Sequence, residues 1–366
     1  MKQSPVRILI TGGGTGGHVY PGLAVAKAVE KLAPGSEVRF AGTSRGIESE
    51  LVPKAGYRLA TVPASGLRGL GGWARFLFVW NFFRGFLRSL MMLIVWRPRA
   101  VLGTGGYVSA PVMLAARVLG ISCALQEQNA VPGSTNRLVA RWARRIYLGF
   151  SSAAGYFKAD RCLETGNPVR AEFLAAARHV RDSEGTGGKN LLVFGGSRGA
   201  ATLNAAVSEA AAAWNERTDL SGLIQTGGAD HPKVAAAFAA GGGGRFTVVP
   251  YIDDMATALH QADLVVSRAG AMTLAELQCV GRPAVLVPFP FATDDHQLHN
   301  AEDCARSGAA VVLKDADCDG PGLLRIVFEL LDDPDRLSEM GQAAAALARP
   351  EAADAIAADL LQLAGN

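Results

Sequence analysis

Two glycine-rich turns are the first features of this 366-residue chain that could do chemistry. They are GGGTGGH, residues 12–18, and GGSRG, residues 195–199, and each follows a strand-like apolar run and precedes a helical pattern. Backbone N–H groups and the helix dipole at such a turn can bind an anion. Ser197 adds a hydroxyl that can donate to a phosphate, although a tight turn with a solvated serine would give the same pattern. The turns therefore predict a phosphorylated ligand.

A third candidate is the segment VVSRAGAMTLAE, residues 265–276, in which a strand ends and a helix begins between Ala269 and Thr273. The first N–H groups of a helix have no partner within it, so they can meet a diphosphate. Glu276 falls one to two turns inside this helix, where its carboxylate can accept hydrogen bonds from both hydroxyls of a ribose. A glutamate in this position could instead simply complement the helix dipole.

Two common nucleotide-binding motifs do not fit the first turn. Gly12, Gly14 and Gly17 match the GxGxxG spacing of dinucleotide-binding folds. Those folds place an acidic residue near the end of the second strand, where this chain has Phe-Ala-Gly-Thr at 40–43. A P-loop requires Lys-Ser or Lys-Thr after its glycines, and neither follows here. The sequence thus argues against a nicotinamide cofactor and against a P-loop.

The elements that must position these turns alternate between short apolar strands and helical patterns, as in parallel sheets covered by helices. Early strands are predicted at residues 6–11, 37–41, 100–103 and 121–126. The first helix is predicted at residues 21–32, with Pro21 at an early position where a missing N–H is tolerated.

The length of the chain favours two domains. A second strand series begins at Asn190, and the polar, glycine-rich residues 181–189 before it are a predicted linker. We therefore predict domains at residues 1–180 and 181–345. Residues 346–366, which are rich in alanine and amphipathic, are predicted to form a closing helix.

The composition indicates a folded protein from a reducing compartment. Hydrophobic residues make up 49% and charged residues 19% of the chain, far from the disordered class. The five cysteines are scattered and never form a CxxC pair, which argues against a disulfide framework and a zinc site. The N-terminal residues enter a strand-like run without a separate signal-peptide core, so we expect no secretion.

The charge is unevenly distributed along the chain. The net charge is +3, yet no acidic residue occurs between Glu50 and Glu127. Within that gap, residues 67–96 mix Trp, Phe and Leu with arginines that interrupt the apolar runs, so we expect this segment not to cross a bilayer.

Aromatic and aliphatic residues mixed with arginine suit a surface that lies on an anionic membrane, and we predict this contact for residues 67–99. A helix packed on the core, with arginines that reach water, is the alternative. Because bulky aliphatic residues separate the basic ones, we expect no nucleic acid partner.

Several separated motifs occur in order along nearly the whole chain. They are TGGGTGGHVYPGLAVA, GTGGYVSAP, QEQNAVPGSTNR, TGNPVR, FGGSRGAATLN, YIDDM, SRAGAMTLAE and VPFPFATDDHQLHNA. Through them the chain resembles the lipid II-forming N-acetylglucosaminyltransferases of glycosyltransferase family 28. The resemblance implies an α/β GT-B fold, with two Rossmann-like domains whose parallel sheets face a cleft. It also implies that the closing helix returns towards the N-terminal domain.

The same resemblance implies an activity and a location. The activity is inverting transfer of N-acetylglucosamine from UDP-GlcNAc to the C4 hydroxyl of lipid I, which is undecaprenyl diphosphate carrying N-acetylmuramoyl-pentapeptide. The N-terminal domain would bind the acceptor and the membrane, and the C-terminal domain would bind UDP-GlcNAc. The protein would lie peripherally on the cytoplasmic face of the bacterial plasma (inner) membrane.

The substrate-binding residues that the resemblance implies lie in both halves of the chain. Thr15, Gly16 and Gly17 would approach the donor sugar and diphosphate, and the lipid diphosphate would lie near Gly105-Gly106. The others are Asn129 on the GlcNAc, Arg170 and Ser197 on the phosphates, Ile252 on uracil, Gln297 on GlcNAc hydroxyls, and Ala271, Met272, Thr273, Leu274, Ala275 and Glu276 on the diphosphate and ribose. Some members have two glutamines in the last motif, whereas this chain has His296-Gln297.

Inversion by direct attack requires a base for the acceptor hydroxyl and stabilisation of the departing UDP. His18 is the first candidate base, since an unperturbed imidazole has a pKa of about 6.5. A histidine that caps the loop is the alternative. Glu127 is the rival base because it stands beside Asn129, although a structural carboxylate is equally consistent with the sequence.

Arg170, the Ser197 turn and the helix that begins near Ala271 can meet the charge of the leaving group. No DxD pair stands where a divalent ion would be expected, because Asp253-Asp254 and Asp294-Asp295 are adjacent pairs. We therefore predict a reaction that needs neither a metal nor a cofactor.

Three other functions remain open at this point. A different GT-B transferase would share the donor half, but it would not need both GGTGGHVYPGLA and EQNAVPGSTNR. A nonhydrolysing UDP-GlcNAc epimerase also has a GT-B fold, and it would form UDP-ManNAc without an acceptor. A nucleotide-binding membrane adaptor would bind UDP without any turnover.

Overall fold

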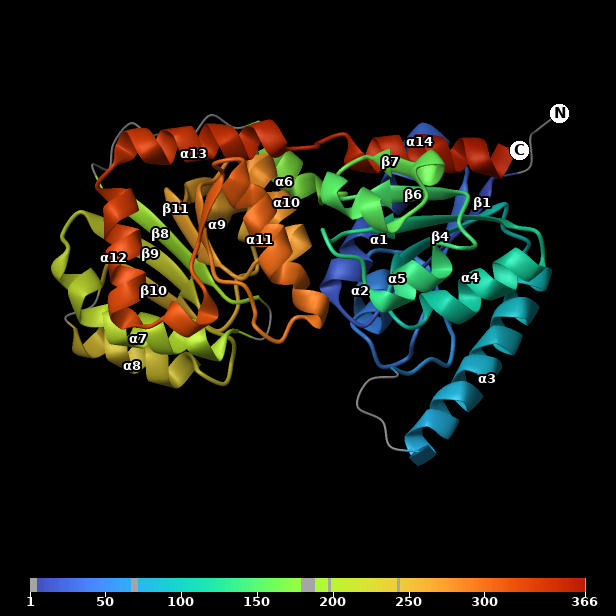
Figure 1. Cartoon of the computed structure of the whole chain (residues 1–366), viewed down its shortest axis with the longest axis horizontal. Helices are drawn as coiled ribbons and strands as arrows, with labels where there is room; N and C mark the ends of the chain where they lie inside the picture. The colour runs from blue at the N-terminus through green and yellow to red at the C-terminus, as the bar shows by residue number, and fades with distance from the viewer. Residues whose placement is uncertain (1–4, 67–71, 179–187, 197–198, 242–243, 366) are drawn as a thin grey trace. The chain divides into compact units, whose positions relative to one another are not determined.

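The computed structural model covers all 366 residues and describes all but 1–4, 67–71, 179–187, 197–198, 242–243 and 366. The chain divides into two compact units (Figure 1). One is Met1–Arg170 with Arg349–Asn366, and the other is Ala171–Ala348. Most of the predicted linker at 181–189 lies outside the described residues.

Within its described residues, the N-terminal unit is built on a seven-stranded parallel sheet of order β3-β2-β1-β4-β5-β6-β7. The strands are β1 (Arg7–Gly12), β2 (Glu37–Gly42), β3 (Arg58–Thr61), β4 (Ala100–Gly105), β5 (Ser122–Glu127), β6 (Arg145–Leu148) and β7 (Cys162–Glu164). The central strands are buried on both faces, as parallel strands covered by helices must be.

Helices cover both faces of this sheet. They are α1 (Gly16–Leu32), α2 (Glu48–Lys54), α3 (Gly72–Trp96), α4 (Ser109–Val118), α5 (Ser134–Val139), α14 (Ala352–Gly365) and the 3-10 helices Ser151–Tyr156 and Ala159–Arg161. Ile8 and Ile10 join the core formed with α1 and α14, whereas Leu9 joins the core under α3 and α4. This alternation places the two helix layers on opposite faces of β1. Helix α14 packs on α1, and Lys31 Nζ lies 2.7 Å from the Asp354 carboxylate.

The predicted strands of this unit match β1, β2, β4 and β5 closely, but the predicted start of the first helix is wrong. Helix α1 begins at Gly16, after the extended N-cap Thr15, so Pro21 lies inside the helix. Proline there removes one intrahelical hydrogen bond. Val19 and Leu23 are buried on both sides of Pro21, so packing on the sheet holds the earlier turn in helical form.

Within its described residues, the C-terminal unit contains a six-stranded parallel sheet of order β10-β9-β8-β11-β12-β13. Its strands are β8 (Lys189–Phe194), β9 (Leu220–Gln225), β10 (Phe246–Val249), β11 (Leu264–Ser267), β12 (Ala284–Leu286) and β13 (Ala310–Val312). Its helices are α6 (Ala171–Ala176), α7 (Ala201–Glu216), α8 (His231–Ala240), α9 (Met255–Gln261), α10 (Ala271–Val280), α11 (His296–Arg306), α12 (Gly320–Leu331), α13 (Pro334–Leu347) and the 3-10 helices Thr293–Asp295 and Asp315–Asp317. Trp214 stacks on Phe246 in its core.

Each sheet gathers its candidate segments at one edge, because all its strands are parallel. In the N-terminal unit, β1, β4 and β5 are neighbours, and residues 12–18, 105–106 and 127–129 follow their carboxyl ends. The strand order reverses between β1 and β4, which is the position where open α/β sheets bind ligands. The predicted fold of two parallel-sheet α/β domains is confirmed.

Candidate functional site

The first glycine turn packs against a second turn that follows β4. The Gly13 N–H donates to the Gly105 carbonyl at 3.3 Å. Gly106 has φ of 80°, and a Cβ at this position would lie 2.3 Å from the Gly13 oxygen. Only glycine therefore allows the two turns to meet this closely. Together they form a continuous backbone surface at the switch point of the sheet.

His18 is held at the end of the first turn by its Nδ1 atom. Nδ1 lies 3.1 Å from the Gly13 carbonyl oxygen and 3.3 Å from the Thr15 hydroxyl. A carbonyl can only accept, so Nδ1 carries the proton. In the neutral ring the lone pair is then on Nε2. A Cβ at Gly105 would lie 2.8 Å from this Nε2, so the ring rests directly on the second turn.

Glu127 is buried at the end of β5 with amide donors on both carboxylate oxygens. Oε1 accepts from the Asn129 backbone N–H at 2.9 Å and from Asn129 Nδ2 at 3.2 Å. Oε2 accepts from Asn136 Nδ2 at 2.8 Å. Burial raises the pKa of Glu127 despite these donors. The carboxylate therefore fixes the orientation of Asn129.

Polar side chains tie these segments together. The Thr104 hydroxyl donates to the His18 carbonyl at 2.7 Å, and Gln128 Nε2 donates to the Thr104 carbonyl at 2.7 Å. Asn167 Nδ2 donates to the Gln128 carbonyl at 2.9 Å, which fixes the segment that leads to Arg170. Each of these three side chains is buried, so their hydrogen bonds hold the loops in a single arrangement.

Arg170 lies beside the first turn of α1. Its guanidinium carbon is 4.6 Å from the centre of the Tyr20 ring. A Cβ at Gly16 would lie 3.1 Å from the same ring, so Tyr20 joins Arg170 to the glycine turn. A cation stacked in this way is pre-oriented for an anion near the helix N-terminus.

The C-terminal unit presents the helix N-terminus predicted after β11. Helix α10 begins at Ala271 after the extended N-cap Gly270, and the predicted residues 271–276 occupy its first turns. Glu276 is buried, with a relative exposure of 9%. Asn300, fully buried, donates from Nδ2 to the Ala269 carbonyl at 3.2 Å and so holds the turn that precedes α10.

Gln297 and Arg268 organise the loop after β12. The Phe289 N–H donates to Gln297 Oε1 at 3.0 Å, which leaves two N–H donors on Nε2 of this amide. Arg268 donates to the Val287 carbonyl at 3.1 Å and pairs with Asp315. His296 Nδ1 bonds the Thr293 carbonyl at 2.8 Å and so holds the start of α11.

Ile252 and Ser197 are the other residues predicted for the C-terminal unit. Ile252 is buried in the loop that follows β10, and Ser197 lies outside the described residues.

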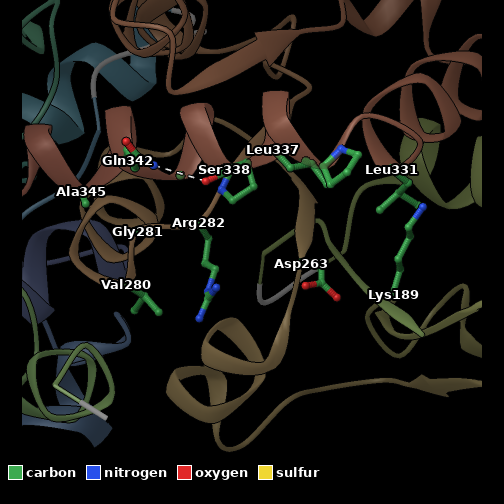
Figure 2. Close-up of a pocket in the computed structure, with 13 residues that line it drawn as sticks. Lys189, Asp263, Val280, Gly281, Arg282, Leu331, Leu337, Ser338, Gln342 and Ala345 are labelled. Carbon is green, nitrogen blue, oxygen red and sulfur yellow. Dashed lines mark hydrogen bonds between the residues drawn. The ribbon is translucent and has the colours of Figure 1, made fainter. Parts of the chain in front are cut away.

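A cavity of about 570 Å³ lies beside Arg282 and Asp263 (Figure 2). It is at the amino end of β8 and β11, away from the predicted site, and its Lys189 pairs with Asp219 and Asp332. Among the described residues, no group of three or more His, Cys, Asp or Glu could hold a metal.

Both halves of the chain match known domains. Residues 8–148 match the glycosyltransferase family 28 N-terminal domain, and residues 190–356 match the glycosyltransferase family 28 C-terminal domain. The chain belongs to glycosyltransferase family 28. It is a glycosyltransferase.

Relatives of this family 28 glycosyltransferase extend over its whole length. A UDP-N-acetylglucosamine--N-acetylmuramyl-(pentapeptide) pyrophosphoryl-undecaprenol N-acetylglucosamine transferase of Geobacter sulfurreducens is 43% identical over 360 residues, covering 97% of this chain and 98% of the relative. A protein of the same name from Chlorobium limicola is 41% identical, and the match covers 98% of this chain and 100% of the relative.

Solved structures confirm the GT-B fold of the family 28 chain. MurG of Acinetobacter baumannii superposes with a TM-score of 0.79 at 31% identity, over 98% of this chain and 100% of that one. A UDP-GlcNAc 2-epimerase of Neisseria meningitidis, bound to UDP-GlcNAc, superposes with a TM-score of 0.71 at 11% identity, over 98% and 100% of the two chains. The second likeness shows the fold alone.

The candidate site of this family 28 glycosyltransferase also contains residues that were not predicted from the sequence. Asn136, Arg268 and Asn300 all lie in motifs that were recognised, but a motif does not show which of its side chains turns inward. Thr104 also lies in such a motif. Glu48 lies in none of them, although an acidic residue at the start of a helix, five residues after a Gly-Thr pair that ends a strand, was a usable signal.

Proposed function

We propose that this family 28 glycosyltransferase transfers N-acetylglucosamine from UDP-GlcNAc to the C4 hydroxyl of lipid I, with inversion, and so forms lipid II for peptidoglycan synthesis. The observation that carries the proposal is 43% identity, over 97% of this chain, to a relative named for this reaction. The two family 28 domain matches, at residues 8–148 and 190–356, include the glycine turns of both units. Donor and acceptor elements therefore share one ancestry rather than being combined from separate families.

His18 is the base in this proposal. The bond from Nδ1 to the Gly13 carbonyl supports this role, because it places the lone pair of the neutral ring on Nε2. The ring lies on the Gly105–Gly106 turn, where the acceptor diphosphate would bind. The C4 hydroxyl of the acceptor would lose its proton to Nε2 as it attacks the anomeric carbon, and UDP would depart.

Glu127 is the rival base, and its surroundings favour a different role. A general base must reach the proton that it removes. Both oxygens of Glu127 accept from the amides of Asn129 and Asn136, and the side chain is 1% exposed. We therefore assign Glu127 to the orientation of Asn129, which would contact the GlcNAc.

We assign donor contacts to residues of each unit separately. In the C-terminal unit, the N–H groups at residues 271–275 would bind the diphosphate, Glu276 the ribose, and Ile252 the uracil through its backbone. Gln297 would donate from Nε2 to GlcNAc hydroxyls. In the N-terminal unit, Arg170 and the turn at residues 15–17 would meet the donor sugar and diphosphate, and Ser197 would complete the phosphate contacts.

Helix α3 is the proposed membrane contact. One face packs on the domain: Ser89, Leu93 and Trp96 are buried, and a Cβ at Gly85 would lie 2.3 Å from the Pro63 carbonyl oxygen. The other face exposes an apolar stripe at helical spacing. Its residues are Trp80, Phe83, Leu87, Met91, Ile94 and Val95.

The exposed arginines beside this stripe favour an anionic bilayer as its partner. Arg84 and Arg88 lie next to the stripe on the same helix and are exposed. Leu77–Trp96 also meets the length and hydropathy expected of a membrane-crossing helix. Because one face of α3 is packed on the domain, we propose that the helix lies in the interface, with the enzyme on the cytoplasmic face of the plasma membrane.

The deciding experiment is transfer of radiolabelled GlcNAc from UDP-GlcNAc to a lipid I analogue. UDP-glucose and a polyprenyl diphosphate without the muramoyl group are the controls. Transfer to the lipid I analogue alone supports the proposal. Transfer only to another lipid, or formation of UDP-ManNAc without an acceptor, would replace it with one of the other GT-B functions.

A further inference from the structure

Glu48, the first residue of α2, places a carboxylate directly behind the first glycine turn. Its side chain is fully buried. Oε2 accepts from the Gly14 N–H at 2.8 Å, and Oε1 accepts from the Thr43 N–H at 2.9 Å and from the Thr43 hydroxyl at 2.7 Å. These donors outweigh the effect of burial and lower the pKa of Glu48, so the group is a carboxylate anion.

Three glycines leave the space that this carboxylate fills. A Cβ at Gly13 would lie 2.3 Å from Oε1, one at Gly42 would lie 2.6 Å from Cγ, and one at Gly46 would lie 2.1 Å from Oε2. The three positions lie in the turn after β1, at the end of β2 and in the loop before α2. Glu48 is thus a component of the turn rather than a surface residue that happens to be buried.

Glu48 and His18 bind the two ends of the same peptide group. The peptide between Gly13 and Gly14 donates its N–H to Glu48 and accepts at its carbonyl from His18 Nδ1, 3.1 Å away. In a trans peptide these two groups point in opposite directions. The peptide therefore connects a buried anion on one side to the imidazole on the other.

A hydrogen bond from an N–H to an anion polarises the peptide and makes its carbonyl a stronger acceptor. A stronger acceptor at Gly13 O holds the proton on Nδ1 and fixes the ring plane. The arrangement is an analogue of a carboxylate that orients a histidine directly, with one peptide group between the two.

We propose that Glu48 is a positioning residue that acts on His18 through the Gly13–Gly14 peptide. It keeps the imidazole in the tautomer with the proton on Nδ1, and it holds Nε2 towards the acceptor site. The proposal rests on the role of His18 as the base in the proposed function. It requires no contact between Glu48 and a substrate.

The test compares Glu48→Gln with Glu50→Gln, an exposed position on the same helix. Glutamine keeps the shape of the side chain, but its NH₂ faces one N–H donor whichever way the amide turns. We expect kcat to fall by about 10- to 100-fold, a part of what a general base contributes. The dissociation constant for UDP should stay within about twofold, and Glu50→Gln should behave as the wild type.

The spectroscopic readout is the ¹⁵N spectrum of the His18 ring, assigned by its loss in His18→Gln. The wild type should show a protonated Nδ1, and folded Glu48→Gln should show a mixture of tautomers. An unchanged tautomer together with unchanged kcat would overturn the proposal. This readout needs no turnover, so it remains decisive if the proposed transfer activity itself fails.

Hydrogen exchange of the wild-type enzyme covers the case in which Glu48→Gln does not fold. The Gly14 amide should exchange at least about 100-fold more slowly than an exposed loop amide, because it is bonded to a buried anion. Exchange of the Gly14 amide at the rate of an exposed loop would refute the relay.

Discussion

At the scale of single residues, the candidate site consists of backbone groups of glycine turns and a few buried polar side chains that hold those turns. His18 is fixed by the carbonyl of Gly13, and Asn129 is fixed by Glu127. Glu127 lies at the carboxyl end of β5, whereas His18 lies in the first turn of α1 and rests on the backbone of the second glycine turn. Their different surroundings predict different responses to substitution.

Replacement of His18 by alanine should remove the base without removing the donor site. We expect kcat to fall by about 100- to 1,000-fold, the range typical of a lost general base. The dissociation constant for UDP should be unchanged, since His18 itself is not among the proposed nucleotide contacts. His299→Ala, at an exposed position on α11, is the matched control. Near-normal turnover of His18→Ala would exclude His18 as the base.

Replacement of Glu127 by glutamine should change stability more clearly than catalysis. Burial raises the folded-state pKa of Glu127, so its stabilising contribution is complete below the unfolded pKa and is lost as pH rises through the folded pKa. The Tm of Glu127→Gln should therefore rise relative to that of the wild type as pH increases above the ordinary pKa of a glutamate.

A glutamine at position 127 can still accept a hydrogen bond from Asn129. We therefore expect kcat to fall by less than about tenfold. Thermal unfolding across this pH range and steady-state kinetics measure both effects. A loss of kcat as large as that of His18→Ala, with normal folding, would instead identify Glu127 as the base.

At the scale of secondary structure, helix α3 has a buried face and an exposed apolar face. Ser89 and Leu93 bind it to the N-terminal unit, while an apolar stripe with neighbouring arginines faces away from that unit. Both faces of the described part of α3 are therefore apolar, but its exposed stripe is not buried against the described residues of the domain. We attribute the open face to the membrane.

A double substitution, Leu87→Glu with Met91→Glu, should test this assignment. We expect binding to anionic phospholipid vesicles to weaken by at least about tenfold, because two apolar side chains no longer enter the interface. Val118→Glu, at an exposed apolar position at the end of α4, is the control. Binding by the wild type should also weaken at high salt. Full vesicle binding by the double variant would exclude this face.

At the scale of the whole molecule, the leaving-group charge would be met by Arg170, by the N-terminus of α10 and by the turn that contains Ser197. Helix dipoles and guanidinium groups can take the place of a divalent cation in stabilising a diphosphate. The GT-B architecture supplies such helix termini at the carboxyl edge of each sheet, since every strand in both sheets is parallel.

We therefore expect transfer by the intact enzyme to be independent of divalent cations. Addition of EDTA should change kcat by less than about twofold, because no step depends on a Lewis acid. The measurement is the transfer assay with a lipid I analogue, in buffer treated with chelating resin. Loss of activity in EDTA, followed by recovery with magnesium or manganese, would contradict this expectation.

The sequence by itself determined the α/β class, the strands that lead into the glycine turns and the motifs of family 28. Apolar runs followed by glycine turns are local signals, and parallel strands necessarily bring the turns to one edge. Only the tertiary structure decided that α1 begins before Pro21, that Asn136 holds Glu127 and that Glu48 meets the Gly13–Gly14 peptide. These depend on packing between segments that are distant in sequence, such as Gly14 and Glu48, which are 34 residues apart, and local propensity carries no information about such contacts.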